Sequence, residues 1–257
     1  MAKYSSKDVG FFLLGSYSLL GSTTKIEDTV ELKLTETYVL GDADEAYWSS
    51  GAKKTDVTQD GWFDDAAGSV HAAFSGLSTV ALPMTIAFQG NTVATTGSGT
   101  PVDIYQSVQR VGYDVQLTVG EVTKAVGRYG IWYGKKGGKL AFPLQTKTTA
   151  GNGDTDPDNP IHGTNPAGTN GGAMVLHITA LSGCTDCTIT LRHSTDGTTY
   201  SDKTAFSAFT PANVTAGIAS EYKALSGTIN RFTTAGWAYT SPSSPSVTFA
   251  IGVYVAP

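Results

Sequence analysis

Short runs of alternating apolar and polar residues, separated by turn residues, constrain this chain more than any other feature. Over residues 29–37, valine and leucine alternate with charged and polar residues, which is the pattern of a half-buried strand. Glycine occurs 30 times in 257 residues, and charged residues make up 15% of the chain, below the roughly 25% of an average domain. These features favour short strands joined by turns, and we predict an all-β protein.

The N-terminal part is predicted to be a β-sandwich or barrel with one short helix. The helix is expected over residues 64–74, where two aspartates begin an amphipathic pattern and suit the helix dipole. A glycine-rich hairpin is expected over 134–139, and long loops over 42–54 and 90–103. The candidate strands are 9–20, as two short strands around Gly15, then 29–37, 56–63, 83–88, 105–110, 112–117, 130–133 and 140–144.

Residues 148–172 divide the chain, because Gly, Pro, Asn, Asp and Thr dominate there and Ile161 is the only large apolar residue. This composition predicts a linker or a long exposed loop. It separates a domain of residues 1–147 from a smaller antiparallel β-sandwich of immunoglobulin-like type at residues 173–257, for which no helix is required. The candidate strands of the second domain are 174–181, 188–193, 204–209, 217–225, 231–240 and 246–255.

Charge and hydropathy exclude several classes of protein. The net charge of -5 and the pI of about 5.3 argue against a basic surface that binds nucleic acid tightly. No apolar run approaches the roughly 18 residues of a membrane span, and no clear cleavage site follows the N-terminal lysines. We expect synthesis in a cytoplasm and no membrane insertion.

No cluster of residues predicts catalysis, a metal site or a cofactor site. The chain has no nucleotide-binding, HExxH or GxSxG motif. Cys184 and Cys187 form a lone CxxC between two strand candidates, which favours a tight turn over a redox or zinc site. The acidic stretch 154–158 lacks the glycine and distal glutamate of a calcium loop. Residues 194–200 are typical of a hairpin turn. The four histidines, which are dispersed along the chain, are His71, His162, His177 and His193.

One segment resembles a known family. Tyr38 to Asp42, then Trp48 and Gly51, then Val57 to Asp65 leading into a small helix, are similar to the tail tube (major tail) proteins of long-tailed bacteriophages. The resemblance covers most of residues 9–147. It implies a β-sandwich that assembles as stacked, hexameric rings around a channel for DNA, with the C-terminal domain on the outer surface of the tube.

This resemblance implies a virion tail location and a set of partners. The partners are further copies of the chain, the terminator, tape measure and tail tip proteins, and phage DNA that passes non-specifically through the lumen. Deleting residues 45–51 is expected to block polymerisation and to leave the sandwich folded. The candidate subunit-contact residues are Asp42, Asp44, Glu45, Tyr47, Trp48, Trp62 and Phe63.

Two other classes of function stay open. A capsid-decorating protein or head fibre would use the N-terminal half to trimerise on a shell. A carbohydrate-binding module would need an exposed aromatic platform, for which Tyr200, Trp237 and Tyr239 are the candidates. Weak contact with host-surface glycans through these rings is compatible with a tail tube role. An enzyme is not expected.

Overall fold

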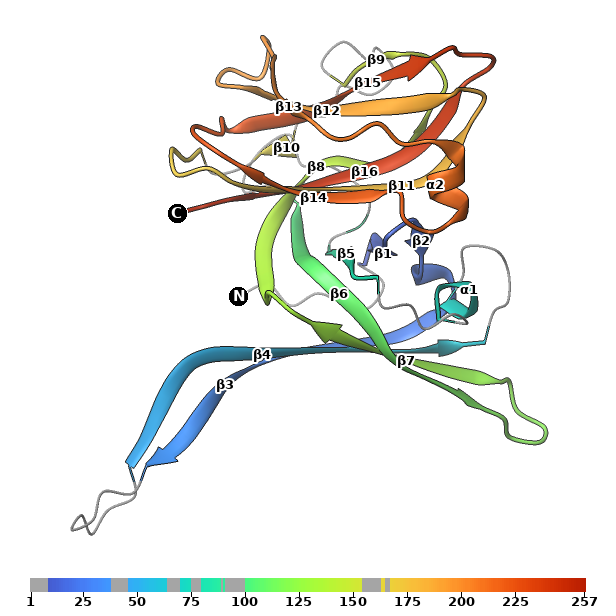
Figure 1. Ribbon diagram of the computed structural model, residues 1–257, viewed down its shortest axis with the longest axis vertical. Helices are drawn as coiled ribbons and strands as arrows, with labels where there is room; N and C mark the ends of the chain where they lie inside the picture. Colours follow the sequence, from blue (N-terminus) through green and yellow to red (C-terminus); the bar gives the residue numbers. More distant parts are fainter. Residues whose placement is uncertain are drawn as a thin grey trace.

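A computed structural model describes residues 9–37, 46–63, 70–74, 80–88, 90, 100–153, 163–164 and 167–257 (Figure 1). Strands dominate this part of the chain, as predicted. The elements in chain order are β1 (Phe11–Leu14), β2 (Tyr17–Ser18), a 3-10 turn (Leu20–Ser22), β3 (Thr23–Thr37), β4 (Ala46–Trp62), α1 (Val70–Phe74), β5 (Leu82–Ala87), β6 (Pro101–Gln116), β7 (Lys124–Ile131), β8 (Lys135–Lys147), β9 (Gly151–Asn152), β10 (Gly163–Thr164), β11 (Gly172–Ser182), β12 (Asp186–Ser194), β13 (Ser201–Ala205), α2 (Pro211–Thr215), β14 (Ser220–Leu225), β15 (Phe232–Thr240) and β16 (Ser246–Val255).

The C-terminal half forms a two-layer sandwich, which we call the body. One layer is the run β14-β11-β16-β8, and the other is a five-stranded sheet built on β10-β15-β12-β13 with β9 added to β15. Alternate residues of both layers meet in one buried cluster. At its centre the rings of Phe142 and Phe249 stack at 4.6 Å, and Trp237 packs on both. The sandwich is therefore held by aromatic and aliphatic burial.

The body layer continues without a break into the N-terminal half. β8 pairs with β16 on one side and with β6 on the other, and the sheet then runs on through β5, β1 and β2. One buried cluster contains Leu13 from β1, Ile104 from β6 and Ala250 from β16. The predicted boundary after residue 147 therefore does not coincide with a boundary between two sheets. β8 precedes it in the chain, yet β8 belongs to the body through its pairing with β16.

β6 is the strand at which the large sheet divides. β5 lies along one edge of β6, and the other edge pairs first with β8 and then with β7. Between these two partners, Trp132 to Gly134 bulge out of the ladder, and Gly134 has a φ of 69°, which a glycine adopts without strain. β7 leaves the body at this bulge and pairs with β4 instead of β16.

A polar contact fixes the β1–β2 turn to the body. His177 of β11 is buried and donates from Nδ1 to the carbonyl of Gly15 at 2.8 Å, which leaves Nε2 to accept from the Thr85 hydroxyl at 2.9 Å. A Cβ on Gly15 would lie 2.3 Å from the carbonyl oxygen of Gly217, so the two backbones approach each other as only glycine allows. Burial lowers the pKa of His177 to about 4, and the ring is neutral.

Most predicted strands are confirmed, and the differences have physical causes. Residues 112–117 and 105–110 merge into β6 across a bulge at Arg110. The predicted 134–139 hairpin is wrong, because these residues extend along β6 as the start of β8. The short helix α2 was not expected from the sequence; Thr210 caps it in a capping box with Asn213. The predicted helix is confirmed for residues 70–74, while 64–69 lie outside the described residues.

Two predicted loops prove to contain strands. Residues 46–54, expected within a loop, belong to β4 and pair with β3. Residues 148–172, expected to be a linker, supply β9 and β10, which both pair with β15. Backbone N–H and C=O groups of any residue type can be satisfied by an adjacent strand, and composition alone does not reveal such pairing.

Candidate assembly surface

β3, β4, β7 and the part of β6 after Val108 form a four-stranded antiparallel sheet that leaves the body, and we call it the arm sheet. The β3–β4 hairpin extends to one side, and the β6–β7 hairpin extends to the other (Figure 1). Both hairpins exceed the usual five or six residues per strand, since β4 has 17 residues and β6 has 16. The arm sheet therefore offers backbone and side chains well beyond the core.

The inner face of the arm sheet is used by the core near the root of the arms. Tyr129 and Gln59 are buried on this face, and the Tyr129 hydroxyl donates to Oε1 of Gln59 at 2.5 Å. The Phe74 ring of α1 lies 5.2 Å from the Tyr129 ring and covers Gly127, where a Cβ would lie 2.6 Å from a ring carbon. This face is already occupied within a single copy.

The outer face of the described part of the arm sheet is polar, because the even-numbered residues over 56–62 of β4 and 124–130 of β7 point away from the core. Lys25 pairs with Glu27 at 2.5 Å, and Arg128 pairs with Asp114 at 3.0 Å. The contact raises the pKa of Lys25 and lowers that of Glu27, through their mutual hydrogen bond first and their charges second. Both pairs are exposed, so they contribute little to stability but neutralise two cations of this face.

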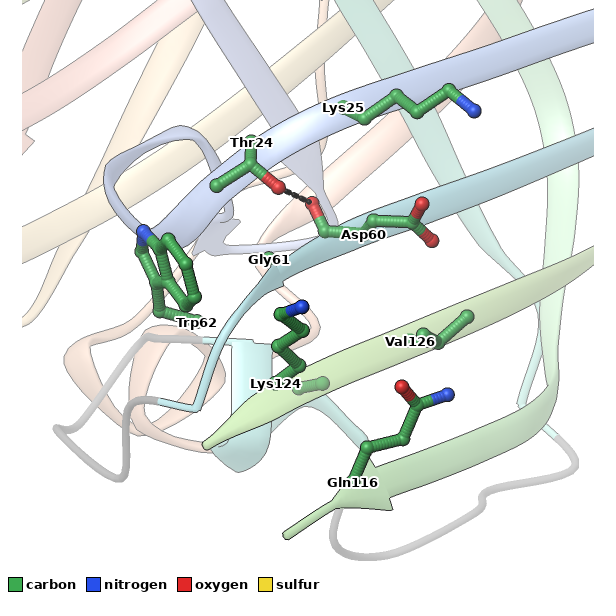
Figure 2. Close-up of a pocket in the computed structure, with 9 residues that line it drawn as sticks. Thr24, Lys25, Asp60, Gly61, Trp62, Gln116, Lys124 and Val126 are labelled. Atoms are coloured by element: carbon green, nitrogen blue, oxygen red, sulfur yellow. Dashed lines mark hydrogen bonds between the residues drawn. The ribbon is translucent and has the colours of Figure 1, made fainter. Parts of the chain in front are cut away.

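A groove of about 490 Å³ lies at the end of this polar face, where β3, β4, β7 and β6 meet (Figure 2). Trp62 flanks it with 43% of its surface exposed. The Thr24 hydroxyl donates to the carbonyl of Asp60 at 3.2 Å and closes one wall. Its lining carries both signs of charge, from Lys25, Asp60 and Lys124. The groove is therefore a hollow of mixed charge on the outer face of the arm sheet.

Both edges of the arm sheet are open among the described strands. β3 pairs with β4 alone, and β6 beyond Arg110 pairs with β7 alone. Because each of the four strands is antiparallel to its neighbour, β3 is antiparallel to β6. Open edges present unpaired N–H and C=O groups, which favour pairing with another chain.

The tip of the β6–β7 hairpin exposes apolar side chains. Leu117 is 80% exposed, Val119 is fully exposed and Val122 is 64% exposed, with Val115 beside them at 41%. Clusters of this kind on a folded chain mark interaction surfaces. Sequence reasoning missed them because it ended the strand at 117 and assigned no element before residue 130; the signal was the presence of Val119 and Val122 in that interval.

The predicted contact residues are distributed along β4. Tyr47 and Trp48 lie in the outer part of β4, paired with Glu36 and Thr35 of β3. Trp62 ends β4 at the groove. Phe63 follows it, donates its N–H to the carbonyl of Thr123, and places its ring 4.7 Å from that of His71. Asp42, Asp44 and Glu45 lie outside the described residues. These contacts stay predictions.

The three rings proposed to form an exposed glycan platform do not form one. Tyr200 and Trp237 are buried, with 8% and 6% of their surface exposed, so the predicted exposure of both is wrong. Trp237 Nε1 donates to the carbonyl of Thr149, and the half-buried Tyr239 donates to that of Lys147. The Trp237 ring lies in the core and the Tyr239 ring packs against its edge, and each is held by a hydrogen bond to the backbone of residues 147–149. Glycan binding stays a prediction that these rings do not support.

The other sequence candidates have structural roles. Cys184 and Cys187 are free thiols: Cys184 lies in the turn between β11 and β12, as predicted, whereas Cys187 already belongs to β12 and pairs with Tyr239 of β15. Burial raises the pKa of Cys187 to about 12. Asp196 accepts from the N–H groups of Thr198 and Thr199 in the turn between β12 and β13. Within the described residues no three His, Cys, Asp or Glu side chains gather as metal ligands, and no helix is long and apolar enough to cross a bilayer.

Comparisons with known proteins return structural neighbours only. No protein-family model and no curated protein matches the chain. A chain of the native gene transfer agent virion is similar to it with a TM-score of 0.37 and 10% identity, over 52% of this chain and 97% of that one. A chain of the empty gene transfer agent tail, refined with C6 symmetry, gives a TM-score of 0.35 and 7% identity, over 44% and 80%.

A third neighbour covers nearly the whole chain. It is the Dit protein of phage SPP1, described as a hub of the adsorption apparatus in phages that infect Gram-positive bacteria. It is 10% identical, with a TM-score of 0.34, over 95% of this chain and 98% of that one. These three neighbours are thus components of phage-type virions, tails or tail hubs. At these scores they assign no family to this chain.

Proposed function

We propose that this protein is a structural component of a phage-type virion tail, and that its copies join edge to edge into rings that stack as a tube. The observation that carries the proposal is the pair of open, mutually antiparallel edges on one four-stranded sheet. β3 of one copy can continue the antiparallel ladder of β6 in the next, and such a head-to-tail contact closes into a ring when the rotation allows.

Closure of this kind creates a barrel whose two faces differ, as those of the arm sheet do. The inner face of each arm sheet packs on its own core, so the polar face lines the channel. Over residues 25–28, 56–60, 110–116 and 124–130 this face carries Lys25, Lys124 and Arg128 against Glu27, Asp56, Asp60 and Asp114. Acids outnumber bases, so phosphates are not held, and DNA passes without specific binding.

The remaining features fit stacking of rings. The apolar β6–β7 tip and the β3–β4 hairpin extend beyond the core, where each can reach a neighbouring ring. The body carries its own sandwich core and lies on the outside of the tube in this arrangement. The ring is hexameric in the family that the sequence resembles. Terminator, tape measure and tail tip proteins are the further partners that this role requires, and the role needs no catalysis.

Negative-stain electron microscopy of the purified chain, with light scattering for mass, tests the proposal. Hollow filaments or stacked rings are expected on concentration. Val115→Pro near the end of β6 removes an N–H from the open edge, since its neighbours Asp114 and Gln116 direct theirs to β7, and should reduce assembly much more than the matched Val115→Ala. A persistent monomer contradicts the proposal. A small closed oligomer without a channel would favour a capsid-decorating or head-fibre role.

A further inference from the structure

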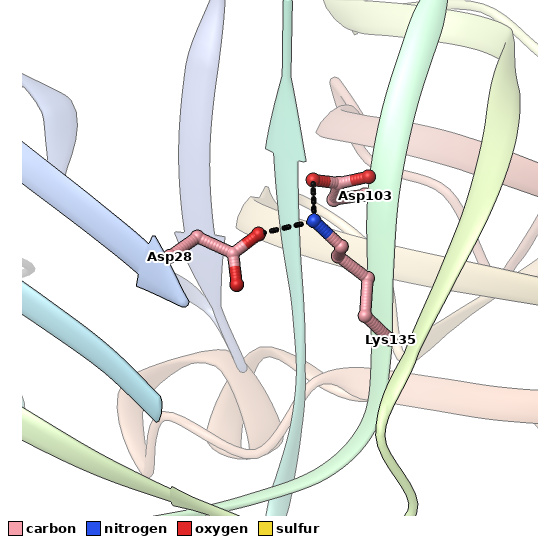
Figure 3. Close-up of polar contacts among 3 residues, drawn as sticks. All are labelled: Asp28, Asp103 and Lys135. Carbon is pink, nitrogen blue, oxygen red and sulfur yellow. Dashed lines mark hydrogen bonds and ion pairs between the residues drawn. The ribbon is translucent and has the colours of Figure 1, made fainter. Parts of the chain in front are cut away.

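A lysine lies between two carboxylates at the root of the arm sheet (Figure 3). Nζ of Lys135, at the start of β8, is 2.5 Å from Oδ2 of Asp28 on β3 and 3.1 Å from Oδ2 of Asp103 on β6. The side chains are 29%, 14% and 16% exposed, in that order. This arrangement is far more shielded than the ion pairs of the polar face, so its groups are held in one geometry.

Two buried polar atoms beside this contact lack a partner. The Tyr105 hydroxyl belongs to a fully buried side chain, and neither it nor Oδ1 of Asp28 has a hydrogen bond among the described residues. Burial, and then the charges of Asp28 and Asp103, raise the pKa of the Tyr105 phenol far above its usual value. A protonated hydroxyl without a partner, close to Asp28, is a donor available to that carboxyl group.

We propose that Lys135 and Asp28 condense into an isopeptide bond between Nζ and Cγ. The Lys135 ammonium first passes a proton to the Asp28 carboxylate across their contact, which gives an amine and a carboxylic acid. Nζ then attacks Cγ, the C–O bond to the hydroxyl breaks, and one water molecule leaves. The reaction joins an ammonium and a carboxylate into an amide plus water, so atoms and charge balance without an oxidant or a further reactant.

The two neighbouring groups have separate roles in this step. Asp103, starting in its protonated form, gives a proton to the departing hydroxyl and then takes up the proton that Nζ loses on forming the amide. The Tyr105 hydroxyl donates to the oxygen on which negative charge develops. Burial raises the pKa of Asp103 against the opposing effect of Lys135, which favours the protonated form that such an acid needs.

The protonation state of Lys135 limits the rate of the condensation. Desolvation lowers the pKa of Lys135, but its hydrogen bond to Asp28 and the charge of Asp103 outweigh this effect, and the net pKa is raised. The ion pair is therefore the resting form, and condensation proceeds from the minor neutral form after folding. The product would join residues 107 positions apart and fix the root of β3 to a strand that also belongs to the body.

Intact-mass spectrometry of the folded, full-length chain tests this proposal. The folded protein should lose the mass of one water on incubation, and a sample kept in denaturant should not. In a tryptic digest the bond should join peptide 26–33 to peptide 129–136, because a modified Lys135 no longer directs cleavage. Peptide mapping matters here, since Asp60-Gly61 and Asp196-Gly197 can lose water as succinimides that join no two peptides.

Variants separate the bond from an ordinary ion pair. Lys135→Arg keeps the charge and should abolish the joined peptides, whereas Lys136→Arg, one residue along, should keep them. Asp103→Asn should slow their formation at least tenfold in a protein whose circular dichroism is unchanged. Full mass in folded wild type after prolonged incubation overturns the proposal. This result is independent of ring formation, which the microscopy above measures separately.

Discussion

The body and the arm sheet are both built from antiparallel strands, yet they differ in how far they bury their apolar side chains. In the body, the inner residues of β11, β12, β15 and β16 meet across two layers and leave few apolar groups exposed. Among the described side chains of the arm sheet, burial is confined to the root, and the β6–β7 tip exposes leucine and valine. The body buries its apolar side chains within one chain, whereas the arm sheet keeps two open edges among the described strands, which we propose a second copy completes.

The largest change in the free energy of unfolding is expected when a large side chain at the centre of the body is truncated. Phe142→Ala opens a cavity beside Phe249 and Trp237 and should lower the free energy of unfolding by about 3–5 kcal/mol, as measured by urea denaturation. Leu117→Ala, at the exposed arm tip, is the matched control and should change it by less than about 0.5 kcal/mol. Equal losses for the two variants would remove the distinction between the regions.

The contact between the body and the β1–β2 turn should make stability depend on pH. His177 has a folded-state pKa of about 4, below the roughly 6.5 of an unfolded histidine. The unfolded chain therefore binds a proton first as pH falls, so this stability is complete above pH 6.5 and is lost toward pH 4. The loss should reach about 3 kcal/mol.

Urea midpoints measured across this pH range should show the loss in wild type and a flatter profile in His177→Gln. His193→Gln serves as the control and should keep most of the wild-type slope. A profile of His177→Gln that parallels the wild type would show that the buried ring is not the cause.

A smaller effect is expected where the arm sheet meets its core. Tyr129→Phe removes the donor to Oε1 of Gln59 and leaves that oxygen buried without its partner, which should cost about 1–3 kcal/mol in the free energy of unfolding. Tyr133→Phe removes the same hydroxyl from a ring that is 67% exposed and should be neutral. A neutral Tyr129→Phe would mean that water enters this site.

The smallest effect on folding should coincide with a large effect on assembly. Val119→Ser replaces a fully exposed apolar side chain at the β6–β7 tip, so thermal unfolding should hardly change. Light scattering at high concentration should show fewer or shorter assemblies, because ring contacts lose apolar area. Wild-type assembly by this variant would show that the tip contacts nothing.

The contrast between the two regions was only half predictable from the sequence. Body strands such as 246–255 show clear alternation, because each buries one face against a partner layer of the same chain. The length of the arms was not predictable, since residues 46–54 have the composition of a loop, and among the described strands they pair with β3 alone. The contact of Lys135 with Asp28 joins residues 107 positions apart. It depends on the curvature of the whole sheet, so no local sequence pattern indicates it.

Cross-linking of the two open edges tests the central claim most directly. In a background of Cys184→Ser and Cys187→Ala, Lys25→Cys on β3 is mixed with Gly112→Cys, Asp114→Cys or Gln116→Cys on β6, all on the polar face. At least one mixture should form a disulfide-linked dimer under mild oxidation, and the partner that reacts best reports the register. Dimers from Lys25→Cys alone, with none specific to any mixture, would contradict a head-to-tail junction of the arm sheets.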